Sequence, residues 1–281
     1  MLHDISDVSV IICTKNNVKN IEYVINSVLK QSPGEIIVVD GSSTDGTREV
    51  LEKLPVKLLS DPGKGLALAR QIGLDEAKKK YVFYSGDDNI YRKNEIYDLK
   101  VYMNNHDYKC VGMLNRVYDA SKDYWSKCAD IRWKARFSEG ERPVVGTPNM
   151  YEASTIKSMK WNTRRRFSDD TDLQERIKKI GGRIAYSNIQ CYEIGQTGYE
   201  ETIARFTMYG VSDYEVWINK KDLWSLRRKV KSLLHPMRDE LICPLISSIK
   251  TIEKIYALPY FVLVTILRYK SWIINIKDNK K

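Results

Sequence analysis

The chain has 281 residues, of which 43% are hydrophobic and 29% charged, and its formal net charge is +10. These values predict a globular protein with one large core, or one core and a small additional unit. The five cysteines are odd in number and far apart, with no CxxC pair, which excludes a complete disulfide framework and a CxxC metal clip and favours a reducing compartment. The first residues are acidic where an export signal is positively charged, so we predict a cytoplasmic location.

The positive charge is concentrated at one end of the chain. Residues 215–281 carry 14 Lys and Arg against 6 Asp and Glu, whereas residues 1–214 carry 32 against 30. A basic segment of this kind suits either nucleic acid or an anionic membrane surface. We therefore predict a domain over residues 1–214 and a basic tail over residues 215–281 with a separate role.

Short β-rich apolar runs alternate with segments of helical period in the first hundred residues. We predict strands over residues 8–13, 35–40, 56–59 and 81–85, and helices over residues 21–29 and 66–77. This alternation builds an α/β fold with a mostly parallel sheet covered by helices. Ligands bind beyond the carboxyl ends of such strands, so the polar residues that follow the strands are the first candidates for a functional site.

Asp40 closes the second predicted strand and begins the segment DGSSTDGT. Its carboxylate can accept hydrogen bonds from both hydroxyls of a ribose or from the imide edge of uracil, and the helix that follows offers free backbone N–H groups. Alternatively, the polar residues of this segment only cap that helix. Asp45 is the strongest candidate for a cap, and for the others both interpretations remain open.

Asp87 and Asp88 follow the fourth predicted strand in the segment YSGDDN. Adjacent carboxylates repel each other unless a cation shares them, and Mg²⁺ or Mn²⁺ is commonly held by one or two carboxylates together with diphosphate oxygens. An exposed turn would have the same composition. The position at the end of a strand favours a metal site.

Residues 13–112 and 144–184 together resemble the family 2 glycosyltransferases, inverting enzymes of the GT-A type that transfer a sugar from a nucleoside diphosphate. CTKN is similar to the family's opening loop, DGSSTDGT to its nucleotide-binding segment and SGDDN to its metal motif. VVGTPNMY is similar to the acceptor-side segment, and DDTDLQERIKKIGG to the stretch that carries the catalytic base. The resemblance implies a nucleotide-sugar donor, UDP-linked slightly in preference to GDP-linked, and Mg²⁺ or Mn²⁺.

The resemblance also implies roles for individual positions. Asp170 is the expected base, and Asp87 and Asp88 are the expected metal ligands. Donor or substrate contacts are expected at Thr14, Asn16, Asp40, Ser42, Lys64, Arg70, Ser85, Gly86 and Arg205. Two positions depart from the family pattern: Ser85 stands where the metal motif commonly begins with aspartate, and Asp169 replaces the usual glutamate before the base.

The acceptor is predicted to be a hydroxyl, because an alcohol must lose its proton as it attacks and a positioned carboxylate can take it. A lipid phosphate would need no base, so a polyprenyl-phosphate sugar synthase is the alternative within this class.

The residues of this region also have structural alternatives. Asp170 or Asp172 could instead cap a helix over residues 172–180. The run Arg164 to Arg166 is either solvated or flanks an anionic acceptor. A protein that binds nucleotide sugars without turnover is the alternative outside the enzymes.

The tail combines cations with apolar stretches. One helical face carries Leu223, Leu226, Val230 and Leu233, a pattern typical of helices on anionic membranes. The apolar run over residues 255–267 has thirteen residues, short of the roughly 20 that cross a bilayer; packing as core is its alternative. Without a recognisable nucleic-acid module, we predict peripheral binding to the cytoplasmic face of a membrane, a glycan or lipid-linked acceptor and no nucleic-acid partner.

Overall fold

The computed structural model describes residues 3–165, 168–195 and 197–278, and the chain forms two compact units. The first unit contains residues 1–115 and 138–194, and the second contains residues 116–137 and 195–281. These units divide the chain differently from the predicted boundary after residue 214. The segment 116–137 leaves the first unit to join the second, which is therefore built from two separate stretches of sequence.

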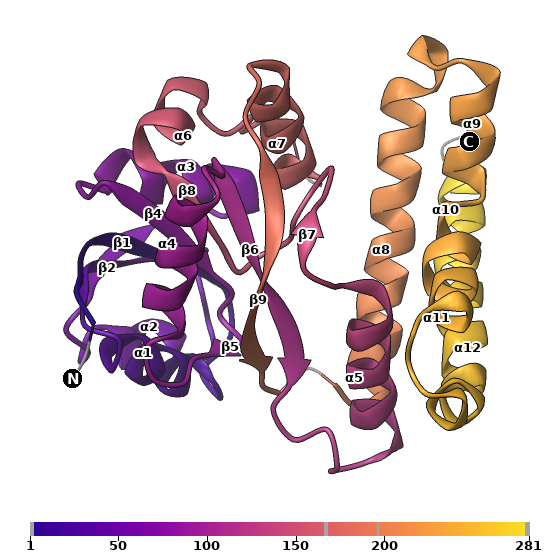
Figure 1. Cartoon of the computed structure of the whole chain (residues 1–281), viewed down its shortest axis with the longest axis horizontal. Helices are drawn as coiled ribbons and strands as arrows, with labels where there is room; N and C mark the ends of the chain where they lie inside the picture. The colour runs from indigo at the N-terminus through magenta and orange to yellow at the C-terminus, as the bar shows by residue number, and fades with distance from the viewer. Residues whose placement is uncertain (1–2, 166–167, 196, 279–281) are drawn as a thin grey trace. The chain divides into compact units, whose positions relative to one another are not determined.

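The first unit is an α/β structure around one mixed sheet (Figure 1). Its parallel part is ordered β3-β2-β1-β4. The elements of this part are β1 (Ile5–Thr14), α1 (Ile21–Leu29), β2 (Pro33–Asp40), α2 (Thr47–Leu51), β3 (Lys57–Ser60), α3 (Leu66–Glu76) and β4 (Tyr81–Ser85). The predicted alternation of strands and helices over the first 85 residues is confirmed.

The sheet continues from β4 through β8, β6, β9 and β5, with β7 beside β9. The pairs β4–β8, β6–β8, β5–β9 and β7–β9 are antiparallel, so the sheet is mixed rather than mostly parallel. The elements of this part are β5 (Asn89–Ile90), α4 (Glu95–Asn105), β6 (Cys110–Val117), β7 (Gly140–Glu141), β8 (Asn149–Glu152), α6 (Ala153–Met159), α7 (Asp169–Lys179) and β9 (Ile184–Glu193).

The central strands are apolar on both faces because helices cover them. Val10, Ile11 and Ile12 of β1 are fully buried, and α1 packs its buried residues into the same core. Gly73 of α3 allows a close approach, since a Cβ there would lie 2.5 Å from Ile11 Cγ2. The register aligns the strand ends: Thr14 is opposite Asp40, and Ile12 is opposite Ser85. The polar residues after β1, β2 and β4 therefore emerge at one edge of the sheet.

The second unit is helical. It consists of α5 (Tyr124–Arg136), α8 (Tyr199–Lys220), η1 (Lys221–Leu223), α9 (Leu226–Leu233), α10 (His235–Met237), the π-helical turn η2 (Arg238–Ile242), α11 (Cys243–Ile246) and α12 (Thr251–Asp278). Helices α8 and α12 lie side by side (Figure 1). Gly210 is required at their contact, because a Cβ there would be 2.4 Å from the carbonyl oxygen of Arg268. The predicted C-terminal helices are confirmed.

Helix α5 belongs to this unit because its inward face completes the unit's core. Cys128 and Ile131 of α5 pack with Phe206 of α8 and with Phe261 and Val264 of α12, and all five residues are buried. The polar sequence around α5 gave no indication of this partnership.

A buried ion network connects α5, η2 and α12. Glu240 is fully buried and accepts hydrogen bonds from Arg132 Nη2 (2.9 Å), Arg136 Nη1 (2.9 Å) and Arg268 Nη1 (2.6 Å). Burial disfavours the charge of Glu240, but the three guanidinium groups outweigh burial and hold the pKa of this carboxyl well below its usual range. Arg268 also pairs with Asp213 of α8 at 2.6 Å. The network therefore fixes the helices of the second unit by charge as well as by apolar packing.

The structure corrects the length inferred for the last apolar segment. The thirteen-residue run lies within α12, which has 28 residues and continues through Pro259. The stretch Thr251–Asn275 is long and apolar enough to cross a membrane by length and composition, with 44% of its most apolar window buried. Its buried face carries Arg268 in the ion network, whereas its outer face exposes Ile255 and Ile266. Part of α12 therefore packs in the core of the second unit. This agrees with the alternative interpretation of residues 255–267, packing as core.

Candidate active site at the strand ends

The loops after β1 and β2 hold each other in place through polar side chains. The Asn16 N–H donates to Ser43 Oγ at 2.9 Å, and the Thr44 N–H donates to Asn16 Oδ1 at 2.9 Å. Asn16 has a φ of +53°, a conformation that asparagine tolerates better than most residues. These bonds bring the predicted residues Asn16 and Asp40 to neighbouring loops at the sheet edge.

Asp40 is buried and bonds mainly within its own turn. Its carboxylate accepts a hydrogen bond from the Ser43 hydroxyl at 2.5 Å, and Arg48 lies 3.9 Å away. Ser42 donates from Oγ to the carbonyl oxygen of Asp61 at 2.9 Å and so ties the end of β2 to the end of β3. Asp45 accepts from the Thr47 N–H at 3.0 Å, but the N-cap of α2 is Gly46, so Asp45 lies one residue before the cap position. Donor contacts at Asp40 and Ser42 stay predictions.

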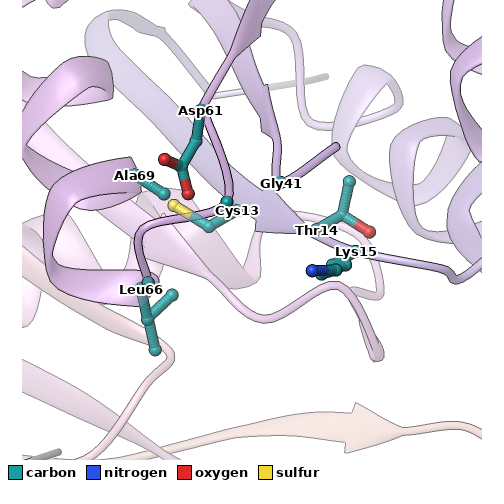
Figure 2. Close-up of a pocket in the computed structure, with 9 residues that line it drawn as sticks. Cys13, Thr14, Lys15, Gly41, Asp61, Leu66 and Ala69 are labelled. Carbon is teal, nitrogen blue, oxygen red and sulfur yellow. The ribbon is translucent and has the colours of Figure 1, made fainter. Parts of the chain in front are cut away.

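A pocket opens between the ends of β1, β2 and β3 (Figure 2). It has a volume of about 190 Å³ and is lined by Cys13, Thr14, Lys15, Gly41, Asp61, Gly63, Gly65, Leu66 and Ala69. A single water needs about 10–15 Å³ by the same kind of measure, so the pocket can take part of a ligand. Thr14 was among the predicted contacts, whereas Asp61 was missed.

The turn that borders this pocket depends on two glycines. Gly63 and Gly65 have φ values of +74° and +110°, which side chains with a Cβ rarely adopt. Lys64 between them is exposed, and its N–H donates to Asp61 Oδ1 at 3.3 Å. Burial raises the pKa of the Cys13 thiol to about 12, so this thiol is neutral at physiological pH.

The turn after β4 places Asp87 against the end of β1. Thr14 Oγ1 donates to Asp87 Oδ2 at 2.8 Å, and Asn17 Nδ2 donates to the Asp87 carbonyl oxygen at 2.6 Å. Gly86 is required, since a Cβ there would lie 2.4 Å from Asn89 Oδ1 and 2.7 Å from Asp88 Oδ1. Burial raises the pKa of Asp87, opposed by its hydrogen bonds. A nearby cation would relieve this cost of burying the carboxylate.

The carboxylates of Asp87 and Asp88 fit Mg²⁺ or Mn²⁺ by their chemistry. Both are hard oxygen donors, and these ions need only one or two carboxylates when a diphosphate completes the shell. Among the described residues no group of three His, Cys, Asp or Glu side chains could hold a metal alone. The Ser85 hydroxyl is buried and bonded to Tyr91 Oη at 2.6 Å, so it already has a protein partner.

Arg70 has different partners from those expected. Its Nη1 donates to Asp169 Oδ2 at 2.8 Å and its Nη2 to Thr147 Oγ1 at 2.9 Å, while the guanidinium lies 4.9 Å from the centre of the Trp161 ring. Burial disfavours the charge of Arg70, but Asp169 and Asp170 outweigh it and raise the Arg70 pKa. Arg70 therefore joins α3 to α7 through a buried ion pair with Asp169, and its donor contact stays a prediction.

Asp170 lies in the first turn of α7, which begins at Asp169 instead of residue 172. The N-cap residue is Ser168, so neither Asp170 nor Asp172 is the N-cap, but Asp170 Oδ1 accepts from the Thr171 N–H of the first turn at 2.7 Å. Asp172 instead pairs with Arg176 at 3.1 Å. Burial raises the pKa of Asp170, and Arg70 opposes this rise. A half-buried carboxylate of raised pKa is well suited to accept a proton.

A buried glutamine fixes the acceptor-side segment to α7. Gln174 Nε2 donates to the Val145 carbonyl oxygen at 2.8 Å and to Tyr151 Oη at 2.8 Å, and its Oε1 accepts from the Val145 N–H at 2.7 Å. These three hydrogen bonds therefore hold the segment VVGTPNMY against α7, the helix that carries Asp170.

Arg205 and the run Arg164 to Arg166 are the other predicted positions. Arg205 is half-buried on α8 of the second unit, so its expected donor contact stays a prediction. In the arginine run, Arg164 is exposed and Arg165 pairs with Asp172 at 3.3 Å, while Arg166 lies outside the described residues.

Comparison with known proteins identifies the family. Residues 9–162, more than half of the chain, match the family model for glycosyl transferase family 2. The chain belongs to this family. It is 37% identical over 91 residues to a cholesterol galactosyltransferase of Borreliella burgdorferi, a match that covers 30% of this chain and 25% of that protein. The chain thus matches only about a quarter of that relative.

Solved structures share the fold. A mannosyltransferase from Pyrobaculum calidifontis in complex with GDP-Man and Mn²⁺ has a TM-score of 0.64 at 16% identity, covering 95% of this chain and 87% of that chain. Residues 1–349 of TarS from Staphylococcus aureus, in complex with UDP-GlcNAc, have a TM-score of 0.54 at 17% identity, covering 92% of this chain and 81% of that chain. The GT-A fold inferred from the motifs is confirmed.

Proposed function

We propose that this glycosyltransferase moves a sugar from a nucleoside diphosphate to a hydroxyl acceptor with inversion. The observation that supports this most strongly is that the contacts at the strand ends connect: Thr14 lines the pocket and donates to Asp87 at 2.8 Å, and Arg70, next to the pocket residue Ala69, pairs with Asp169 at 2.8 Å. A carboxylate pair suited to a metal, a pocket for a ligand and the segment of the expected base thus meet at one edge of the sheet.

The donor end of the site combines Asp87 and Asp88 with the pocket beside β1. Mg²⁺ or Mn²⁺ held by these carboxylates would neutralise the diphosphate as it leaves. The similar structures contain GDP-Man with Mn²⁺ in one case and UDP-GlcNAc in another, which supports a nucleotide sugar as the donor. Thr14 positions Asp87 through its hydroxyl, and the turn at Lys64 places a cation at the rim of the pocket.

Asp170 supplies the base. As the acceptor oxygen forms its bond to the anomeric carbon, the bond to the diphosphate breaks and the hydroxyl proton passes to the Asp170 carboxylate. Attack from the face opposite the leaving diphosphate inverts the anomeric centre. The relatives are named for cholesterol and for poly(ribitol-phosphate), which supports a lipid-linked or surface-glycan acceptor.

Nucleotide binding tests the donor site directly. We expect the thermal midpoint of the full chain to rise with a nucleoside diphosphate and Mn²⁺ together, because a ligand that binds only the native state stabilises it. Asp87→Asn should remove the part of this rise that requires Mn²⁺, since the amide is a much weaker metal ligand. The exposed Asp107 provides the control, and Asp107→Asn should behave as the wild type. No shift with any nucleotide would contradict the proposal.

The basic helix α9 supports a second part of the proposal, attachment to the cytoplasmic face of a membrane. Leu226, Val230 and Leu233 are 78%, 46% and 46% exposed, and no residue of α9 is buried. Four cations and no acid lie in the same helix. An exposed apolar stripe among cations matches the interface of an anionic bilayer, where each cation contributes about 1 kcal/mol.

Vesicle binding tests this attachment. The full chain should sediment with vesicles that contain phosphatidylglycerol and phosphatidylcholine, less with phosphatidylcholine alone, and less at high salt. Val230→Glu should weaken binding at least tenfold, since it places an acid in the apolar stripe. Tyr23, 70% exposed in the first unit, gives the control Tyr23→Glu. If wild type and Val230→Glu bind the vesicles equally well, α9 is not the element that binds the membrane.

A further inference from the structure

We propose that His235 forms a pH-dependent link, which holds the end of the basic helix α9 to the second unit while its ring is protonated. The ring lies at the start of α10, two residues after α9 ends. Histidine is the side chain whose charge ordinarily changes near neutral pH. The link is independent of the proposed function, because neither a nucleotide nor a membrane takes part in it.

Helix α9 depends on its ends for its position in the second unit. None of its residues is buried, so apolar packing contributes little to holding it. At its first turn the Ser225 hydroxyl accepts a hydrogen bond from the Arg228 N–H at 3.4 Å. At its last turn the Leu233 carbonyl oxygen accepts from Tyr269 Oη of α12 at 2.8 Å. Contacts made at His235, directly after this turn, therefore decide how firmly α9 is held.

The two ring nitrogens of His235 face carboxylates from two different elements. Nδ1 lies 3.4 Å from Asp213 Oδ1 of α8, and Nε2 lies 3.1 Å from Asp239 Oδ2 of η2. A protonated imidazole carries a hydrogen on both nitrogens and can donate to both carboxylates at once, whereas the neutral ring carries one hydrogen. Only the charged ring therefore bridges α8 and η2.

Arg268 of α12 gives Nδ1 of the ring a second partner. Arg268 Nη2 lies 3.2 Å from this nitrogen and also donates to Asp213 Oδ2 at 2.6 Å. A guanidinium can only donate, so it bonds to Nδ1 when that nitrogen carries no hydrogen. Loss of the proton thus exchanges Asp213 for Arg268 as the partner of Nδ1. The junction after α9 has one hydrogen-bond arrangement for each charge state of His235.

The groups around the ring favour its protonated form. Burial disfavours the charge of His235, but the hydrogen bonds and charges of Asp213 and Asp239 outweigh burial and raise the His235 pKa. Cations nearby oppose this rise. The charged and titratable groups at or next to the ring are Asp213 of α8, Asp239, Arg238 and Glu240 of η2, Arg268 and Tyr269 of α12, Arg136 of α5, and the exposed Lys231 of α9 four residues earlier.

The link should be closed at low pH and open at high pH. A group whose pKa is raised in the folded chain stabilises it fully below the ordinary value, about 6.5 for histidine, and this contribution is lost as the pH rises through the raised value. For each unit by which the closed link raises the His235 pKa, the opening equilibrium of the junction changes about tenfold across this range.

Histidine ring signals in NMR spectra of the full chain measure the His235 pKa directly. The chain has three histidines, and the variants His3→Gln and His106→Gln assign the other two signals. We expect a His235 midpoint above about 6.5 in the wild type. Asp213→Asn should lower this midpoint, because the amide keeps the shape of the side chain without its charge. A wild-type midpoint at or below the ordinary value would overturn the link, whether or not the substituted chain folds.

Amide hydrogen exchange of residues 226–234, corrected for the intrinsic effect of pH, measures how firmly α9 is held. The wild type should lose protection of this segment as the pH rises through the measured midpoint, by about tenfold for each unit of the raised pKa. His235→Gln has no titrating ring, so its protection should not follow this change, whereas His106→Gln in the first unit should behave as the wild type. Equal pH responses of wild type and folded His235→Gln would contradict the link, as would a raised midpoint without any change in protection.

Discussion

Replacing Asp170 by Asn should reduce sugar transfer about 10²- to 10⁴-fold, the usual contribution of a positioned base, and should leave donor binding unchanged. The amide keeps the size of the side chain at the start of α7 but cannot accept the hydroxyl proton. Release of nucleoside diphosphate from a labelled nucleotide sugar measures the rate, and calorimetry measures donor binding. A loss of turnover with unchanged donor affinity would identify Asp170 as acting in the chemical step.

Asp172 provides the matched control, because it lies two residues away in the same helical turn and pairs with Arg176 and Arg165. Asp172→Asn should retain turnover within a few-fold. Full turnover in Asp170→Asn would contradict a hydroxyl acceptor. That result would favour a lipid phosphate, which is ionised before it attacks, and hence a polyprenyl-phosphate sugar synthase.

The pH dependence of turnover follows from the same carboxylate. Asp170 acts as a base only when it is ionised, so turnover should fall as the pH drops through its pKa. Burial raises this pKa above that of an ordinary aspartate, and Arg70 opposes the rise. The acidic limb should therefore lie above the usual aspartate range, and Arg70→Gln should move it further up. Asp169, Tyr151 and Cys110 also lie within electrostatic range of Asp170.

Replacing Glu240 by Gln should lower the free energy of unfolding of the second unit by about 3–5 kcal/mol, as expected when one partner of a buried ion pair is removed. The amide fits the same space, but the charges of Arg132, Arg136 and Arg268 lose their common partner. Chemical denaturation followed by tryptophan fluorescence measures the change, with attention to separate transitions of the two units.

The control for this variant is Glu215→Gln on α8, a partly exposed position that is expected to change stability by no more than about 0.5 kcal/mol. If Glu240→Gln and Glu215→Gln unfold at the same denaturant concentration, the network contributes little, and apolar packing alone holds the helices together.

Periodicity predicted the parallel half of the sheet because β1, β2 and β4 are largely buried and the helices between the strands carry one apolar stripe. The antiparallel half was missed. Strands β5 and β7 have only two residues each, too few for any pattern to indicate. The motifs also led to Asp87 and Asp170, since Asp87 lies two residues after β4 and Asp170 lies in the first turn of α7.

The partners of the site residues could not be predicted, because they depend on contacts between distant parts of the chain. Arg70 and Asp169 are 99 residues apart, and nothing in either segment indicates the other. Asp61 was overlooked since a lone aspartate before Pro62 and Gly63 has the composition of an ordinary turn. The one available signal was its position directly after a strand in a sheet whose other strand ends had already been selected.

The division of the second unit between two distant stretches has a consequence for biosynthesis. Helix α5 leaves the ribosome long before α8 and α12. Ile131 precedes its partner Phe206 by 75 residues, and Arg132 precedes its partner Glu240 by 108 residues. A chain cut after residue 214 would lack Glu240 and α12, so this surface of α5 would remain without these partners. Such fragments should aggregate or recruit chaperones, and shortened versions for laboratory use should retain α12 or also remove the segment 116–137.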